Sequence, residues 1–204
     1  MDEHEKDAWQ VAEHTWRLAS EEVAKLGDRV DRGAFGECVR MIAECSGRVI
    51  TSGVGTSAAA ARKIAHTLSC VERPAFFLSP ADAVHGALGA VQPGDIAILI
   101  SKGGNTAELL NLIPSLKTKS VPIIAVTENE SSTLASECTQ LLRVWVDREA
   151  DDLNMLATTS TLAVIALFDA VSIAVMKRTR FTREQFKVIH PGGAVGERLL
   201  KGER

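Results

Sequence analysis

The 204-residue sequence lacks an excess of charge of either sign. It carries 23 Lys and Arg against 26 Asp and Glu, its net charge is −3, and its pI is near 6.0. The basic residues are scattered along the chain, whereas binding to a nucleic-acid backbone depends on a basic patch or stripe. We therefore expect no nucleic-acid partner, and expect a small molecule or another protein instead.

A segment that would cross a membrane is also missing. The N-terminus, Met1–Lys6, is polar and mixed in charge, unlike a secretory signal. The longest apolar stretch, Ser160–Met176, is interrupted by Asp169 and is shorter than the ~20 residues of a spanning helix. This stretch predicts a buried helix, and we expect no membrane partner.

Cysteine is scarce, and its spacing predicts no metal site. The four cysteines form no C-x-x-C pair and no pattern with His that suggests zinc; they are Cys38, Cys45, Cys70 and Cys138. We expect reduced, mostly buried thiols, which fits a cytoplasmic protein. Neither a metal nor a cofactor is expected.

The first 46 residues predict two amphipathic helices, over Lys6–Leu26 and Gly33–Cys45. In the first of them, apolar residues recur at spacings of three and four, which makes one apolar face. They are Trp9, Ala12, Trp16, Ala19 and Val23. We expect Trp9 and Trp16 to pack against the rest of the domain or against a second subunit.

From residue 47 onward, short apolar strands alternate with helices. Strands are predicted over Arg48–Thr51, Ala75–Leu78, Asp95–Ile100, Val121–Thr127 and Leu141–Val146, and helices over Ala58–Leu68, Ala107–Leu116 and Thr158–Lys177. This alternation is typical of a parallel sheet covered by helices on both faces. With no linker or repeat, the sequence predicts one α/β domain over residues 1–204. Its N-terminal helices occupy 1–46, and a doubly wound, flavodoxin-like, five-stranded core with a C-terminal tail occupies 47–204.

Two turns rich in glycine and hydroxyl groups follow predicted strands and open predicted helices. They are Gly53-Val54-Gly55-Thr56-Ser57 and Ser101-Lys102-Gly103-Gly104-Asn105-Thr106. Ligands of open α/β sheets bind beyond the carboxyl ends of the strands, where glycine and helix N-termini expose N–H groups to anions. Neither turn has P-loop or dinucleotide-site spacing. The second turn predicts a cradle for a compact phosphate, while the first is equally consistent with helix capping.

At these turns the sequence resembles the sugar isomerase (SIS) domain family. From Val49 to Leu200 it resembles the arabinose-5-phosphate isomerases, through the two turns, Ser79–Gly86, Glu149, Ala157–Thr161 and His190–Gly196. The resemblance implies aldose–ketose isomerisation of a phosphorylated sugar through an enediol, in a homotetramer that shares its sites between subunits. Such enzymes often carry regulatory CBS modules. Because the chain stops at Arg204, we expect no regulation of that kind.

The resemblance also implies the residues of the site. His85, Glu149 and His190 match catalytic positions, with Glu149 as the proton-shuttling base and one of the two histidines for ring opening. The matching substrate-binding residues are Gly55, Thr56, Ser57, Ser101, Lys102, Gly103, Gly104, Asn105 and Thr106. Without the resemblance each catalytic residue carries less weight, since Glu149, for example, sits in the charged run Asp147–Asp152 that is typical of a solvated loop.

Two departures from the family pattern leave the substrate open. Thr56 stands where these isomerases usually have Lys, and Gly103-Gly104-Asn105 stands where they usually have Ser-Gly-Glu. A cation and a carboxylate are thus missing from the expected pocket, and Lys102 could restore the cation or point to solvent. Three interpretations follow: an enzyme like the arabinose-5-phosphate isomerases, an isomerase of another sugar phosphate such as a hexulose 6-phosphate, or a non-catalytic phosphosugar-binding module.

Overall fold

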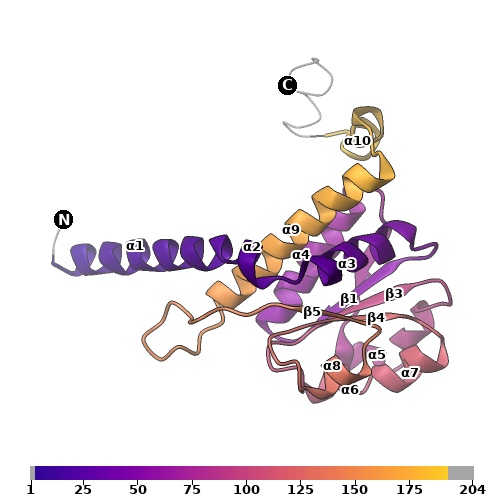
Figure 1. The fold of residues 1–204 in the computed structure, drawn as a ribbon, viewed down its shortest axis with the longest axis horizontal. Coiled ribbons are helices and arrows are strands. Elements are labelled where there is room, and N and C mark those ends of the chain that lie inside the picture. The colour runs from indigo at the N-terminus through magenta and orange to yellow at the C-terminus, as the bar shows by residue number, and fades with distance from the viewer. Residues whose placement is uncertain (1–2, 193–204) are drawn as a thin grey trace.

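The computed structural model describes residues 3–192 and contains one five-stranded parallel sheet (Figure 1). The strands are β1 (Val49–Gly53), β2 (Ala75–Phe77), β3 (Ile96–Ile100), β4 (Ile123–Thr127) and β5 (Gln140–Arg143). Their order across the sheet is β2-β1-β3-β4-β5. This arrangement confirms the predicted doubly wound, flavodoxin-like α/β fold.

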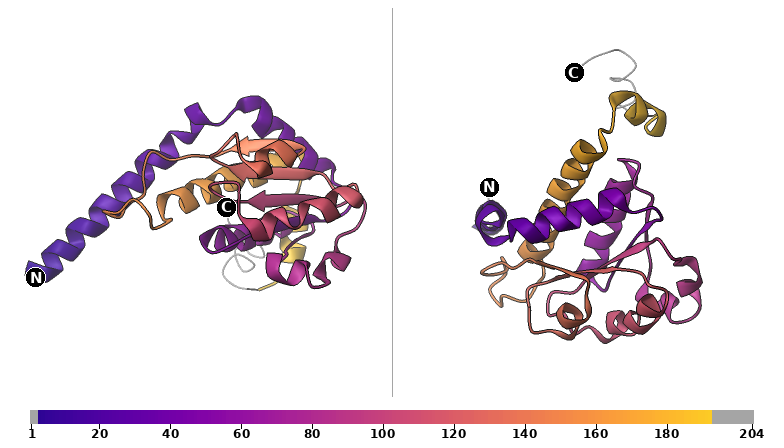
Figure 2. Two further views of the ribbon diagram at one scale, coloured as in Figure 1. Left: turned by 90° about the horizontal axis from the view of Figure 1, so that it is seen from below. Right: turned by 45° about the vertical axis from the view of Figure 1, so that its right-hand side comes forward.

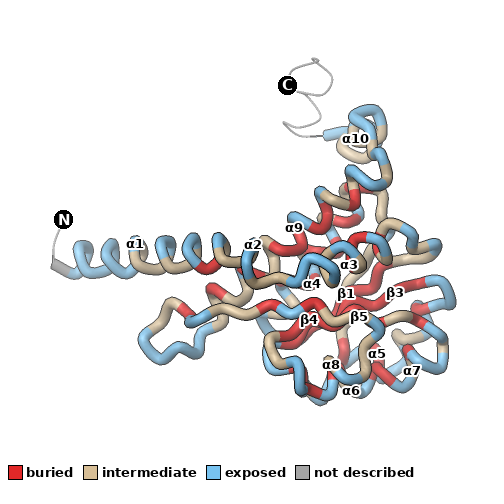
Figure 3. Tube along the Cα trace, viewed as in Figure 1, coloured by how far each residue is buried: buried red, intermediate tan, exposed pale blue. Residues whose placement is uncertain are grey.

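Helices cover both faces of the sheet, and the three central strands β1, β3 and β4 are buried along their whole length (Figure 3). On one face, Ile98 and Ile124 pack with residues of α3 (Arg32–Glu44), α4 (Thr56–Ser69) and α9 (Thr159–Thr179). On the other, Leu99 and Ala125 pack with α5 (Pro80–Ala83), α6 (Ala107–Leu110), α7 (Ile113–Thr118) and α8 (Thr133–Glu137). The remaining short elements are α2 (Leu26–Arg29), η1 (Ala87–Ala90) and α10 (Arg183–Ile189).

The register of β1 and β3 brings the two glycine-rich turns together. Gly53, the last residue of β1, pairs with Ile100, the last residue of β3. From these neighbouring strands the chain crosses to opposite sides of the sheet, which makes their carboxyl ends the switch point where such folds bind ligands. The predicted ligand site and the switch point therefore coincide.

The helix predicted over Ala107–Leu116 is wrong as a single element. The structure has two short helices instead, with Asn111 and Leu112 between α6 and α7 and with Pro114 in the first turn of α7. Proline suits that position because it lacks the N–H that an interior helical residue donates. The second turn is thus followed by a single helical turn, so the helix-dipole contribution expected there is small.

The N-terminal helix α1 (Glu3–Ala24) extends beyond the sheet with much of its surface uncovered (Figure 2). Trp9 and Trp16 are 53% and 57% exposed and meet edge to face, with ring centroids 5.5 Å apart. The expectation that they pack against the rest of the domain is wrong for these side chains.

The apolar helix α9 meets the prediction of a buried helix in part: one side packs in the core, while Leu162 and Ile173 are 46% and 57% exposed. Leu167, Phe168 and Val171 pack with α3, α4 and the sheet. Among the described helices it is the one long and apolar enough to span a membrane by length and composition. The cysteines follow expectation in part: all four are free thiols, but only Cys38 is fully buried.

Candidate functional site

A cleft lies where β3, β4 and β5 end and α4 and α9 begin. Its polar wall includes Thr56 and Ser57 at the start of α4, Lys102 from the second turn, and Ser160 and Thr161 at the start of α9. Its apolar wall includes Val126, Val144, Trp145 and Val146. Hydroxyl groups and a cation next to an apolar surface suit a small polar ligand that is held in a fixed orientation.

The first turn leaves the start of α4 open to the cleft. Gly55 occupies the N-cap position at φ 60° and ψ −130°, a conformation reserved for glycine, and no side chain caps this helix. Ala58 N donates to the Gly55 carbonyl at 3.0 Å, whereas the N–H groups of Thr56 and Ser57 keep their capacity to bind an anion. Thr56 and Ser57, both predicted substrate-binding residues, line the cleft here.

The second turn is held rigid by its own hydrogen bonds. Ser101 is buried, its Oγ lies 2.8 Å from Thr106 Oγ1, and it accepts a hydrogen bond from Gly104 N at 3.0 Å. Gly104 has φ 72°, and a Cβ there would lie 2.1 Å from Ser132 Oγ, so only glycine fits. The hydroxyl groups of Ser101 and Thr106 are thus fixed relative to each other.

Only part of the second turn faces the cleft. Lys102 is its one residue among the described lining residues, whereas Gly103 borders a shallower hollow beside Glu128. Asn105 turns away: its Oδ1 accepts a hydrogen bond from Thr133 N at 2.9 Å, at the start of α8. The position of Asn105 is therefore used to join the turn to α8.

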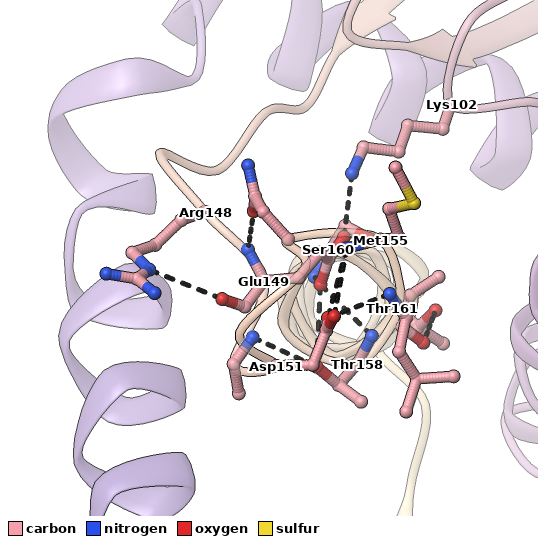
Figure 4. A network of polar contacts seen from close by, with 12 residues as sticks. Lys102, Arg148, Glu149, Asp151, Met155, Thr158, Ser160 and Thr161 are labelled. Carbon is pink, nitrogen blue, oxygen red and sulfur yellow. Dashed lines mark hydrogen bonds and ion pairs between the residues drawn. The ribbon is translucent and has the colours of Figure 1, made fainter.

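Glu149 is buried at the edge of the cleft and bound on both carboxylate oxygens (Figure 4). Oε2 accepts hydrogen bonds from the N–H groups of Thr158 and Ser160, at 3.0 and 3.1 Å. Oε1 accepts one from Lys102 Nζ at 2.7 Å. Asn154 Oδ1 accepts a hydrogen bond from the backbone N–H of Glu149 at 2.6 Å, which fixes the loop. The solvated loop carboxylate suggested by the charged run is therefore not what the structure has.

The two predicted catalytic histidines lie apart from Glu149 within one chain. His85 is exposed between α5 and η1, and its ring has no hydrogen-bond partner among the described residues. His190 follows α10, where its ring stacks on Phe186 at 4.0 Å. Glu149 binds the N-terminal end of α9, whereas His190 lies beyond its C-terminal end, after α10. The 21 residues of α9 therefore separate Glu149 from His190 by about 30 Å. One chain does not bring the three residues together.

Comparison with known proteins identifies the family. Residues 41–174 match the SIS domain family. The chain belongs to this family. As a SIS domain it is 41% identical over 175 residues to the arabinose 5-phosphate isomerase KpsF of Escherichia coli, covering 86% of this chain and 55% of KpsF. The chain spans little more than half the length of the curated relatives it matches.

Two solved structures match nearly the whole SIS domain. A candidate sugar-phosphate isomerase from Listeria monocytogenes superposes with a TM-score of 0.91 and 49% identity, over 94% of this chain and 100% of that one. A protein of Escherichia coli CFT073, solved in complex with arabinose 5-phosphate, gives a TM-score of 0.88 and 34% identity, over 94% and 100%. Both agree with the observed sheet and its flanking helices.

Sequence reasoning on this SIS domain missed the residues that hold Glu149. Thr158 and Ser160 were part of a segment that matched the family but were given no role. Their signal was local: two hydroxyl residues at the start of a long apolar helix, where N–H groups lack partners and attract a carboxylate. Among residues 3–192 no group of three or more His, Cys, Asp or Glu is placed to hold a metal ion.

The ionisation of Glu149 predicts how stability depends on pH. Burial raises its pKa, but hydrogen bonds from Lys102, Ser160 and Thr158 outweigh burial and hold the pKa at about 2, below its ordinary 4.5. A carboxyl group with a lowered folded-state pKa stabilises the protein above the unfolded pKa, and that contribution is lost as the pH falls from about 4.5 toward 2. In urea denaturation, wild type should lose more free energy of unfolding than Glu149→Gln between about pH 6 and about pH 3. Equal losses would contradict the assignment.

Proposed function

We propose that this SIS domain is a sugar-phosphate aldose–ketose isomerase that acts on arabinose 5-phosphate or a close analogue. The observation that carries the proposal is the buried Glu149, which is ionised, oriented by the start of α9 and adjacent to a cleft lined by hydroxyl groups. A similar protein has been solved with arabinose 5-phosphate, and curated relatives are arabinose 5-phosphate isomerases.

In the proposed reaction Glu149 removes the proton from carbon 2 of the open-chain aldose. The electron pair of that C–H bond forms the carbon 1–carbon 2 double bond, and the carbonyl oxygen at carbon 1 takes a proton, which gives the enediol. Return of a proton to carbon 1 and loss of the proton from the carbon 2 hydroxyl give the ketose. No net oxidation occurs, and no external reductant is needed.

The sugar's phosphate binds between the two turns. The start of α4 supplies backbone donors with Thr56 and Ser57, and the second turn supplies Lys102 from the cleft wall. The paired hydroxyl groups of Ser101 and Thr106, which lie outside the described lining of the cleft, are proposed as further donors. In this proposal Gly55, Gly103 and Gly104 shape the backbone around the anion, and Asn105 fixes the turn against α8. Because the first turn carries Thr56 and no cation, Lys102 supplies the positive charge for the phosphate.

The histidines are proposed to come from neighbouring subunits. His190 lies beyond the end of α9 opposite Glu149, His85 is exposed on a separate loop, and α1 leaves Trp9 and Trp16 exposed. A homotetramer that shares its sites would bring one of these histidines to the cleft for ring opening and would cover the apolar face of α1. We place this assembly in the cytoplasm, where free thiols such as Cys38 stay reduced.

A panel of aldose and ketose phosphates with four to six carbons, followed by NMR with the purified protein, tests the function. We expect interconversion of arabinose 5-phosphate and the corresponding ketose phosphate, with slower or no conversion of four- and six-carbon analogues. Saturable binding of these compounds without conversion of any of them would rule out the isomerase and support a non-catalytic phosphosugar-binding module.

Removing one hydroxyl from the phosphate cradle should weaken binding without disturbing the fold. Thr106→Val keeps the shape of the side chain but loses the hydroxyl that lies 2.8 Å from Ser101 Oγ. A hydrogen bond to a charged group contributes about 1.5–3 kcal/mol, so the Kd for arabinose 5-phosphate should rise about 10- to 100-fold. Calorimetric titration measures the change, with Thr106→Ser as the matched control. An unaltered Kd in Thr106→Val would show that the phosphate binds elsewhere.

A further inference from the structure

Lys102, which lines the cleft, binds the carboxylate oxygen of Glu149 that the start of α9 does not hold. Oε2 of Glu149 is held by the N–H groups of Thr158 and Ser160, which are part of the backbone at the start of α9. Oε1 is held by Lys102 Nζ (Figure 4). The Glu149 side chain is 0% exposed, while Lys102 and Ser160 line the cleft. A ligand in the cleft therefore meets Lys102 before it meets the carboxylate.

Lys102 is also the partner of Glu149 that can move. Its side chain is 45% exposed and carries the ammonium on a flexible four-carbon stem, whereas Oε2 is held by two backbone N–H groups, with the Thr158 hydroxyl more distant at 3.5 Å. Among the described residues that line the cleft, Lys102 is the one cation and Glu128 the one carboxylate. An anion that enters the cleft is drawn to Lys102, and a phosphate dianion attracts it more strongly than a single carboxylate does.

We propose that the phosphate of a bound sugar draws Lys102 away from Glu149 and so uncovers Oε1 as the proton acceptor. This inference rests on the proposed function, because it takes Glu149 to be the base. Lys102 is then a positioning residue that pairs with Glu149 in the free protein and with the phosphate in the complex. One lysine in the second turn thereby interacts with both groups, in a chain whose first turn carries Thr56 and no cation.

In the free protein the same contacts make Glu149 a weak base. Burial raises the pKa of Glu149, but its bonds to Lys102 and Ser160 lower it to about 2. A general base works best with a pKa near the working pH, so a carboxylate held this low is a weak base. Once Lys102 leaves, fewer hydrogen bonds oppose the effect of burial, which favours the protonated carboxyl group. The proton affinity of Glu149 therefore rises.

The other charges near Glu149 change little when Lys102 moves. Arg148 Nε donates to the backbone carbonyl of Glu149 at 3.4 Å, and the Asp151 carboxylate accepts hydrogen bonds from N–H groups of its own loop. Glu128 lies on the cleft wall, and α9 contributes only neutral donors to the carboxylate. Lys102 is therefore the charged group that decides the proton affinity of Glu149.

Carbon-13 NMR of the side-chain carboxyl groups in the full chain tests the proposal. The Glu149 resonance is identified by its loss in Glu149→Gln, and its titration midpoint is measured with and without saturating arabinose 5-phosphate. In wild type we expect no titration above about pH 4 without the sugar, and a midpoint about 1–3 units higher with it. Lys102→Met should show a raised midpoint without any ligand, and Lys102→Arg should keep the low one.

Lys102→Met also separates release of the ion pair from the charge of the ligand. A phosphate near Glu149 raises its pKa directly in both proteins, but only wild type gains the further rise from losing Lys102. A larger ligand-induced shift in wild type than in Lys102→Met supports the proposal. Equal shifts in the two proteins, or a low midpoint in ligand-free Lys102→Met, overturn it.

The outcome is distinguishable from failure of the isomerase function, because the titration needs binding and no turnover. If arabinose 5-phosphate binds and shifts the Glu149 midpoint as expected but is not converted, the isomerase fails and the release of Lys102 stands. If the sugar is converted while the midpoint in Lys102→Met stays low, the release of Lys102 fails and the isomerase stands.

Discussion

Glu149→Gln should lower kcat/KM for arabinose 5-phosphate about 10²- to 10⁴-fold, the range that a positioned general base contributes. The glutamine keeps the size of the side chain, and its carbonyl oxygen can still accept from Thr158 N and Ser160 N. Lys102 is 45% exposed and can turn to solvent when its partner is lost. The fold should therefore persist, and the loss should appear in kcat, measured by steady-state conversion.

The control for this substitution is Asp152→Asn, which removes an exposed carboxylate from the same loop. It should leave turnover close to that of wild type, because the side chain is exposed and lies outside the cleft. If Glu149→Gln and Asp152→Asn behaved alike, Glu149 would not be the base, and the proton would have to be moved by another group.

Glu22→Ala should lower the free energy of unfolding by about 3 kcal/mol, although Glu22 lies on the helix that extends furthest from the sheet. Its carboxylate is buried and accepts from Lys25 Nζ at 2.5 Å, Arg29 Nη1 at 2.7 Å and Asp147 N at 2.8 Å. Burial raises the pKa of Glu22, but these donors bring it below its ordinary value, so the group is a charge at neutral pH. Removing one partner of a buried ionic cluster leaves the others uncompensated.

The predicted cost is at the low end for such clusters because Arg29 keeps a second partner. Its Nη2 lies 2.7 Å from Asp147 Oδ2, and its guanidinium lies 3.8 Å over the ring of Trp145, which lines the cleft. Urea denaturation measures the loss. Glu21→Ala, on an exposed neighbour, is the matched control and should cost less than about 0.5 kcal/mol. Equal costs in the two variants would show that the cluster does not join α1 to the loop before Glu149.

The sheet was predictable because its strands are short, apolar and punctuated by glycine or hydroxyl residues. β3 and β4 are buried on both faces, so their nearly continuous apolar runs were unambiguous. The break between α6 and α7 was not anticipated, since the apolar positions continue across it and only Pro114 signals a new helical start. The spacing of apolar residues in α1 predicts an apolar face but not what packs against it, so the exposure of Trp9 and Trp16 could not be predicted.

The site was predictable in its residue types but not in its contacts. Glycine and hydroxyl residues after β1 and β3 could be assigned to the switch point, because strand order follows from topology rules. The pairing of Lys102 with Glu149 could not, since it joins residues 47 positions apart through side-chain conformations. The local sequence around Glu149 also suggested a solvated loop, whereas the start of α9 draws its carboxylate into the protein.

The most direct test of the central claim is the fate of the hydrogen on carbon 2 when arabinose 5-phosphate is incubated with the protein in deuterium oxide. We predict that NMR will show the ketose phosphate forming with deuterium at carbon 1, and deuterium entering carbon 2 of the remaining aldose, both at rates that fall with Glu149→Gln. Absence of ketose, or ketose formed with no deuterium uptake and at the same rate in Glu149→Gln, would contradict a base-catalysed isomerisation at Glu149.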